Sequence, residues 1–238
     1  MSRITIALIA EDDTDCDAIR KIVHRVLGSD ITIKKWASKS CSTLKNKLSK
    51  KLTAMSNEGC DAFIIVHDLD RDPNNNSLND EKKLRSDLEA KCSVLAGIRK
   101  HICIPIEELE AWFWSDPEVI RDVGRGNGKA SPSPHLISKP KEALIRLSVG
   151  KNKKPRYSTN MNAELAERLN LELCSDRCPS FRDLLDFLLS LQISAKQLEV
   201  EIFEVVFAFF LVVQSELHIL AKLLLEDYRF KKCNDQDR

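Results

Sequence analysis

Short apolar runs that lead into acidic residues are the feature that most constrains the fold of this chain. The run ITIALIA covers residues 4–10 and stops at Glu11, and AFIIV at 62–66 is followed closely by Asp68. Runs this short, and rich in β-branched residues, are typical of strands buried on both faces of a parallel sheet. The sequence therefore predicts strands whose carboxyl ends carry acids.

Stretches with helical periodicity separate the apolar runs. Strands are predicted over 4–10, 31–37, 62–66 and 101–106, and helices over 15–27, from a serine cap at 38 or 40 to about 55, over 80–99, from 107, and over 140–148, 161–170 and 180–192. Strands that alternate with helices indicate crossover connections. The expected fold is α/β, with a mainly parallel four-stranded sheet that is flanked by helices and followed by a helical C-terminal region.

Acidic side chains follow three of the predicted strands. Glu11 follows the first, Asp68 and Asp70 follow the third, and Glu108 and Glu110 come shortly after the fourth. Open parallel sheets bind ligands in the crevice beyond the carboxyl ends of their strands. Carboxylates crowded there repel one another unless a proton or a cation neutralises them. Because oxygen donors favour Mg²⁺, with Mn²⁺ as an alternative, the pattern predicts a divalent metal site.

The spacing of the acids suggests their roles. Asp68 and Asp70 are two residues apart, so on an extended chain both side chains point the same way and can hold one ion. A bound Mg²⁺ stabilises the attacking and leaving oxygens of phosphoryl transfer, and Glu11 can serve as general base or as a further ligand. Glu108 or Glu110 can add another ligand. The alternative is that these acids only solvate loops or complement a helix dipole.

These motifs resemble a Toprim domain, the catalytic module of type IA and type II topoisomerases, bacterial-type primases and overcoming-lysogenization-defect nucleases. That family carries a glutamate after its first strand and Asp-x-Asp after its third, which matches Glu11 in LIAEDD and Asp68 and Asp70 in IIVHDLD. Over roughly residues 1–192, the chain is more similar to one Toprim-like group, the domain of unknown function 4276. The segments IPIEELEAWFWSD, KPKEAL, MNAELAERLN and CPSFRDLLDFL carry this similarity.

The resemblance implies a Mg²⁺-dependent nuclease that cleaves DNA, or an RNA such as tRNA. Genes of this group often lie beside an ATPase of the AAA or ABC type, in arrangements similar to anti-phage defence systems. The chain has no Walker-type phosphate loop, so ATP hydrolysis would belong to a partner subunit. One departure is that Asp12 stands where the family commonly has a glycine after its first glutamate.

The overall charge does not indicate nucleic-acid binding. Lys and Arg total 37 against 36 for Asp and Glu, a formal net charge of +1, so any basic surface has to come from local clustering. Lys151, Lys153, Lys154 and Arg156 form such a cluster, with Tyr157 available to stack on a base. The alternative for this cluster is a solvated loop. The lysines at 45, 47, 50 and 51 are expected on a solvated helix face.

Cysteine usage and the apolar segments indicate a cytoplasmic protein. The eight cysteines are scattered and predict buried free thiols in a reducing compartment. The apolar N-terminal run is short and meets acids at once, unlike a signal peptide. The run VVFAFFLVV at 205–213 is far shorter than the ~20 residues of a membrane-spanning helix, so no membrane association is expected.

The C-terminal part is predicted to form one long helix over 195–228. Because it is apolar around much of its circumference, it has to be buried. It either completes the core of this chain or docks in a homo-oligomer or hetero-complex through Phe203, Phe207, Phe210 and Leu217. The expected organisation is a Toprim catalytic domain over 1–115, a helical extension of the same unit over 116–192, and the apolar helix within 193–238.

Two classes of function are open. The leading hypothesis is a metal-dependent endonuclease that acts as the effector of an ATPase-coupled anti-phage system. The alternative is a non-catalytic regulatory or binding subunit of an ATPase complex, which the apolar helix and the near-zero net charge favour. A phosphoryl-accepting receiver domain fits less well, because IPIEELE stands where a receiver carries a lysine.

Overall fold

The computed structural model of the chain describes residues 4–192, apart from residues 73 and 152, and also residue 214. The chain divides into two compact units, Met1–Leu189 and Ser190–Arg238. The predicted interface residues of the long helix, Phe203, Phe207, Phe210 and Leu217, lie outside the described residues. Within the part of the chain that is described, no helix combines the length and apolar character needed to cross a bilayer.

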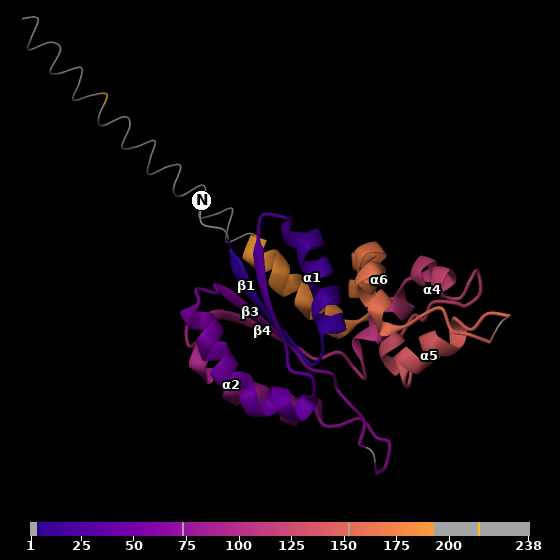
Figure 1. The fold of residues 1–238 in the computed structure, drawn as a ribbon, viewed down its shortest axis with the longest axis horizontal. Helices are drawn as coiled ribbons and strands as arrows, with labels where there is room; N and C mark the ends of the chain where they lie inside the picture. Colours follow the sequence, from indigo (N-terminus) through magenta and orange to yellow (C-terminus); the bar gives the residue numbers. More distant parts are fainter. Residues whose placement is uncertain (1–3, 73, 152, 193–213, 215–238) are drawn as a thin grey trace, which may run out of the picture. The chain divides into compact units, whose positions relative to one another are not determined.

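Four parallel strands form the sheet of the first unit (Figure 1). They are β1 (Thr5–Ala10), β2 (Thr32–Ala37), β3 (Ala62–Val66) and β4 (Arg99–Cys103), in the order β2-β1-β3-β4. Because all four strands run the same way, the residues that follow β1 and β3 leave the sheet at one edge. The predicted α/β fold with a four-stranded parallel sheet is confirmed.

Helices cover both faces of this sheet. Figure 1 shows α1 (Asp13–Leu27) on one face and α2 (Cys41–Asn57) on the other, and α3 (Glu81–Lys91) packs with α2 into one core. Each helix begins at a capping side chain, Asp12, Ser40 or Asp80, which accepts a backbone N–H of the first turn. Ser40 is one of the two predicted caps.

The core under α2 and α3 holds the strands in place. Ile9 of β1 and Phe63 of β3 have no exposed surface, and Leu44, Leu48 and Leu52 of α2 pack in the same cluster. Burial of one such side chain contributes about 1.5–3 kcal/mol. The rigid strands fix the positions from which the acidic residues emerge.

The chain after α3 departs from the predicted boundaries. The helix expected over 80–99 ends at Lys91 and passes into the 3₁₀ helix η1 (Cys92–Leu95), and β4 covers Arg99–Cys103 rather than 101–106. Pro105 explains the early end of β4, because its nitrogen has no hydrogen to donate to the ladder. Pairing then resumes as an isolated bridge between Leu69 and Ile106.

The glutamates that follow β4 do not begin a helix. The helix expected from residue 107 is the 3₁₀ helix η2 (Leu109–Ser115), and Glu107 has a left-handed backbone with φ of 66°. Glu108 is the N-cap residue of η2, and Glu110 lies in its first turn. The explanation that the acids complement a helix dipole therefore does not apply to Glu107 and stays a prediction for Glu108 and Glu110.

Short helices complete the first unit. They are α4 (Pro117–Val123), η3 (Pro134–Leu136), α5 (Pro140–Leu147), η4 (Thr159–Met161), α6 (Asn162–Arg168), α7 (Leu171–Arg177) and a helix that begins at residue 179. Arg25 of α1 donates to the carbonyl oxygens of Ala166 and Leu169, at 2.8 and 2.7 Å. Phe181 packs edge-on against Trp112, with 5.0 Å between ring centroids. These contacts attach the helical part to the sheet.

Candidate active site

Glu11 and Asp68 emerge at the same edge of the sheet, from neighbouring parallel strands. Glu11 directly follows β1, and Asp68 comes two residues after β3. Burial raises the pKa of the Cys41 thiol at the start of α2, and the charges of Glu11, Asp70 and Asp68 raise it further. Cys41 is therefore within electrostatic reach of the three predicted catalytic carboxylates.

Asp68 carries the feature that points most strongly to a ligand. Its Oδ1 atom is buried and has no hydrogen-bond partner among the described residues. Burial raises the pKa of Asp68 well above its usual range, and the charges of Asp15 and Glu110 raise it further. A buried carboxylate oxygen without a partner is unfavourable, so this half-buried side chain favours a proton or a cation at Oδ1. Asp70 is exposed instead.

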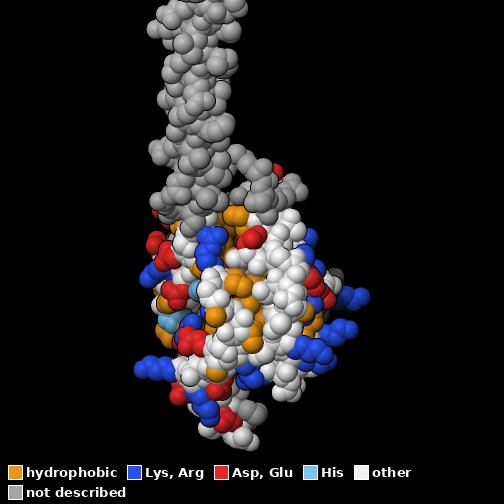
Figure 2. All heavy atoms as spheres, turned by 90° about the vertical axis from the view of Figure 1, so that its left-hand side faces the viewer, with side chains coloured by type: hydrophobic (Ala, Val, Ile, Leu, Met, Phe, Trp, Pro, Cys, Tyr) orange, Lys and Arg blue, Asp and Glu red, His pale blue; other side chains and the backbone are white. Residues whose placement is uncertain are grey.

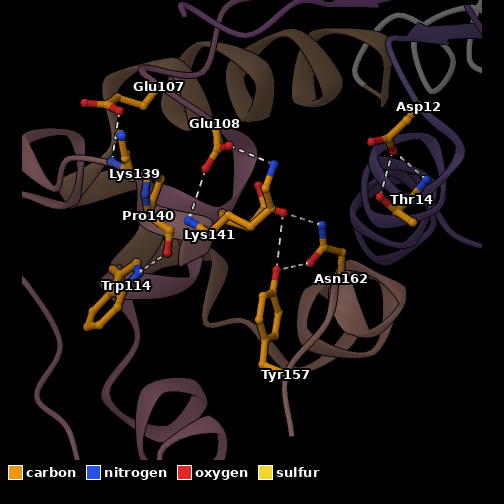
Figure 3. A network of polar contacts seen from close by, with 11 residues as sticks. Asp12, Thr14, Glu107, Glu108, Trp114, Lys139, Pro140, Lys141, Tyr157 and Asn162 are labelled. Carbon is orange, nitrogen blue, oxygen red and sulfur yellow. Dashed lines mark hydrogen bonds and ion pairs between the residues drawn. The ribbon is translucent and has the colours of Figure 1, made fainter. Parts of the chain in front are cut away.

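Asp15 belongs to this acidic group, although the strand-end pattern does not predict it. Asp12 caps α1 and accepts the N–H groups of Thr14 and Asp15, at 2.8 and 3.0 Å; Figure 3 shows the contact with Thr14. This cap starts the helix, and the Asp15 side chain becomes 7% exposed. No local pattern indicated this, because Glu11 lies before α1 and the burial of Asp15 depends on the tertiary fold.

Glu108 and Glu110 are engaged by side chains that come much later in the sequence (Figure 3). Glu108 Oε1 pairs with the Lys141 ammonium at 2.8 Å, and its Oε2 accepts the Lys141 backbone N–H at 3.1 Å. The buried Glu110 accepts the Asn162 side-chain amide at 3.1 Å. Burial raises the pKa of Glu110. Lys141 thus places a positive charge at the site that the acidic motifs do not predict.

Tyr157 is a core residue, and the prediction that it stacks on a base is wrong. Its side chain is 2% exposed. Its hydroxyl lies 3.2 Å from Glu110 Oε1 and 2.7 Å from Asn162 Oδ1 (Figure 3). The ring therefore supports the buried end of Glu110 instead of facing a substrate.

The basic cluster that precedes Tyr157 lies on the surface. Arg156 pairs with Asp122 at 3.2 Å, and Arg168 shares the same carboxylate at 2.8 Å. Lys151, Lys153 and Lys154 are exposed. Their contact with nucleic acid stays a prediction.

A pocket of about 340 Å³ opens beside Asp68 and Asp70. Its lining comes from the end of β3, from α2 and from the start of α3, and consists of Lys45, His67, Asp68, Asp70, Asn79, Asp80, Lys83, Leu84 and Asp87. Lys45, expected on a solvated helix face, lines this pocket instead. Nothing in the spacing of the lysines distinguishes it from its neighbours, because only the tertiary fold brings α2 beside the end of β3.

The His67 side chain contacts protein atoms through both of its ring nitrogens. Its Nδ1 lies 2.8 Å from the carbonyl oxygen of Asp68, and its Nε2 lies 3.1 Å from the Cys41 sulfur. Burial lowers the pKa of His67. Because protein atoms engage both ring nitrogens, the contacts favour packing of the strand end over the alternative that His67 orients a water or a phosphate.

A second pocket of about 180 Å³ shares Asp70 with the first. Arg71, Glu107, Glu108 and Lys139 are among the residues that line it. The guanidinium of Arg71 pairs with the buried Glu107, and the Lys139 backbone N–H donates to Glu107 Oε2 at 3.0 Å (Figure 3). These contacts fix the chain on both sides of the site, next to Asp70 and next to Glu108.

The donor set fits a hard divalent cation, although no complete cage is preformed. Among the residues that the structure describes, no three His, Cys, Asp or Glu side chains stand together in ligand geometry. The unpaired Oδ1 of Asp68 is nevertheless an oxygen donor without a partner, and Asp70 lines the same pocket. Mg²⁺ is commonly held by only one or two carboxylates, because it keeps several waters and binds substrate phosphates. The carboxylates at this edge meet that requirement.

The raised pKa of Asp15 predicts that stability falls as the pH rises. The pKa of Asp15 is about 8 in the folded chain against an ordinary 3.8, so between these values the folded state binds more protons. Burial is the main cause, followed by the charges of Asp12 and Glu110. The free energy of unfolding should therefore decrease across this window, by up to ~1.4 kcal/mol per pH unit.

Denaturant titrations without divalent ions, repeated across this pH window, measure the effect. Asp15→Asn should flatten the pH profile. Asp13→Asn, at an exposed position in the same helical turn, should leave the slope in place. A slope that is unchanged in Asp15→Asn would show that another group causes it.

The fold and this edge together define an α/β protein with a carboxylate-rich site at the carboxyl ends of a parallel sheet. The model of the family described as domain of unknown function 4276 matches residues 10–189. The chain belongs to that family. Comparison with curated proteins and with solved structures found no match.

Proposed function

We propose that this protein is a Toprim-type, Mg²⁺-dependent phosphodiesterase that cleaves nucleic acid. The observation that carries the proposal is the buried, unpaired Oδ1 of Asp68 among the charges of Asp15, Glu110 and Asp70. Such a group is unfavourable in the metal-free protein, and strained electrostatics of this kind are typical of functional sites. Its position beyond the carboxyl end of β3 is where open α/β sheets bind their ligands.

The residues that would hold the ion are Asp68 and Asp70, with Glu11 and Asp15 beside them. The ion, when bound, supplies charge stabilisation to the attacking and leaving oxygens of the phosphodiester. Glu11 accepts the proton of the attacking water at a carboxylate oxygen. Lys141, paired with Glu108 at 2.8 Å, holds the Glu108 carboxylate in place.

The wider setting belongs to the same proposal. The protein acts as the effector of an anti-phage system and receives its ATP-dependent control from an AAA- or ABC-type ATPase subunit. DNA is the first expected substrate, and a structured RNA such as tRNA is the second. The absence of a Walker-type phosphate loop from the sequence supports the division of labour between two subunits.

A non-catalytic regulatory or binding subunit is the second candidate. The contacts of Glu108 and Glu110 favour it, because Lys141 engages both oxygens of Glu108 and Asn162 bonds Glu110. In that case Asp68, whose pKa is raised, would hold a proton, and its unpaired Oδ1 would need no cation.

Cleavage assays with the full chain and its ATPase partner separate the two candidates. Plasmid DNA and total tRNA are incubated with Mg²⁺, with Mn²⁺ and with a chelator. Metal-dependent cleavage that disappears in Glu11→Ala and Asp68→Ala, but persists in the exposed control Glu89→Gln, supports the phosphodiesterase. Intact substrates under every metal condition, with assembly preserved in all variants, would favour the binding subunit.

A further inference from the structure

Two lysines face the acidic end of β3 across one pocket. Lys45 is the fifth residue of α2 and Lys83 the third residue of α3. Both line the 340 Å³ pocket together with Asp68 and Asp70. Lys45 also acts on the buried strand end, because its charge lowers the pKa of His67 in addition to the larger effect of burial. The positive charges are therefore directed at the same place as the candidate metal ligands.

Lys45 and Lys83 differ from other lysines near this edge, which are held in ion pairs. Other lysines around this edge are paired: Lys35 with Asp17 at 2.9 Å, and Lys141 with Glu108 at 2.8 Å. Among the described residues, Lys45 and Lys83 form no ion pair, although Asp80 and Asp87 line the same pocket. Two ammonium groups beside unpaired acids are free to bind an anion that arrives with a cation.

The start of α3 also borders this pocket. Asn79 and Asp80 line the pocket, and the Asp80 carboxylate accepts the backbone N–H of Lys83 at 3.1 Å as the helix cap. This carboxylate is thus engaged by the first turn of α3. The pocket volume lies at the lower end of the ~300–1,000 Å³ that is usual for small-molecule sites.

Charges of both signs are mixed on one face of the molecule. On the face that Figure 2 shows, Lys and Arg side chains are interspersed with Asp and Glu around a strip of apolar side chains. With a net charge of +1, the attraction of a polyanion depends on specific sites. This pocket is such a site once a cation offsets its aspartates, because it places Lys45 and Lys83 beside Asp68 and Asp70.

We propose that Lys45 and Lys83 bind a backbone phosphate next to the phosphodiester that is cleaved at Asp68 and Asp70. The inference rests on the proposed function for the cleaved bond, but the phosphate contact is a binding property that can be measured separately. It makes the substrate a polynucleotide strand with at least two adjacent phosphates. It also assigns the main backbone contact to the pocket, and not to the cluster at 151–156.

Fluorescence anisotropy with labelled oligonucleotides tests this contact without requiring cleavage. The full-length protein is titrated with single-stranded DNA and with RNA of equal length, in Ca²⁺ to limit hydrolysis, at several salt concentrations. The variant Lys45→Ala/Lys83→Ala is compared with Lys47→Ala/Lys82→Ala, a control on the same two helices whose lysines are exposed and absent from the pocket lining. Thermal melts confirm that both variants fold.

The pocket variant should bind about tenfold more weakly or worse, with the slope of log affinity against log salt reduced by about one for each lost phosphate contact. KM should rise more than kcat falls, and Lys45→Arg/Lys83→Arg should recover most of the binding. The proposal would be overturned if the pocket variant had the same affinity and salt slope as the control. It would also be overturned if Lys151→Ala/Lys153→Ala weakened binding and the pocket variant did not. Weakened binding by a protein that never cleaves would keep the phosphate contact and reject the phosphodiesterase.

Discussion

Asp68→Asn is expected to stabilise the metal-free protein while it abolishes cleavage. The Oδ1 atom of Asp68 is buried and unpaired, and asparagine keeps the shape of the side chain without an ionisable group. Relief of the unfavourable burial should add about 1–3 kcal/mol to the free energy of unfolding at neutral pH. For a chain of this size, each kcal/mol raises Tm by about 2–4 °C.

The loss of activity in the same variant should be large. Removal of a metal ligand forfeits several kcal/mol of transition-state stabilisation, which corresponds to about 10³-fold in rate. Calorimetry in a chelating buffer and cleavage assays in Mg²⁺ measure the two effects. Asp87→Asn serves as the control, because it removes the same charge from an exposed residue of the same pocket and should change Tm little. A lower Tm for Asp68→Asn would mean that the carboxylate makes favourable contacts, contrary to our account.

Arg71→Ala should destabilise the protein by about 3 kcal/mol. Glu107 is 6% exposed and Arg71 is 26% exposed at the side chain. Removal of the guanidinium leaves the buried carboxylate without its counter-ion, held by the Lys139 backbone N–H at 3.0 Å. Breaking a buried pair in this way typically costs about 3–5 kcal/mol, and the partial exposure of Arg71 places the expectation at the lower end. Because Arg71 directly follows Asp70, activity should fall as well.

The double variant Arg71→Ala/Glu107→Gln identifies the cause of this loss. If the unpaired charge is responsible, the added Glu107→Gln change should restore a large part of the stability in denaturant titrations. Arg168→Ala is a suitable comparison, because it breaks the exposed pair with Asp122 and should cost less than about 1 kcal/mol. Equal losses in Arg71→Ala and Arg168→Ala would contradict the role given to the Arg71–Glu107 pair.

The strands of the sheet could be predicted because short apolar runs in the local sequence indicate buried strands. AFIIV at 62–66 is observed as β3 with the predicted bounds, Ala62–Val66, since every side chain of the run is buried. The early end of β4 could have been predicted from Pro105, which lies within the run 101–106. Its start at Arg99 depends on pairing with Ala62 of β3, which the apolar pattern does not contain. The left-handed backbone of Glu107 is fixed by the tertiary contacts of its side chain with Arg71 and Lys139, and residue type alone does not predict it.

The edge of the candidate site was predictable, but most of its neighbours were not. Glu11, Asp68 and Asp70 follow strands, so chain topology places them at one edge. Lys141 and Tyr157 reach the site only because α5 and the segment before α6 fold back against η2. Lys45 and Lys83 lie near the starts of α2 and α3, and the packing of these helices brings them to one pocket. No local sequence pattern connects residues so far apart in the chain.

Binding of Mn²⁺, counted by electron paramagnetic resonance, tests the central claim most directly. The wild-type chain should bind at least one Mn²⁺ at neutral pH and release protons as it does so, because the pKa values of Asp15 and Asp68 are raised in the metal-free protein. Asp68→Asn should lose this binding while it stays folded. Equal Mn²⁺ binding by the wild type and by Asp68→Asn would show that the carboxylates at the ends of β1 and β3 are not a metal site.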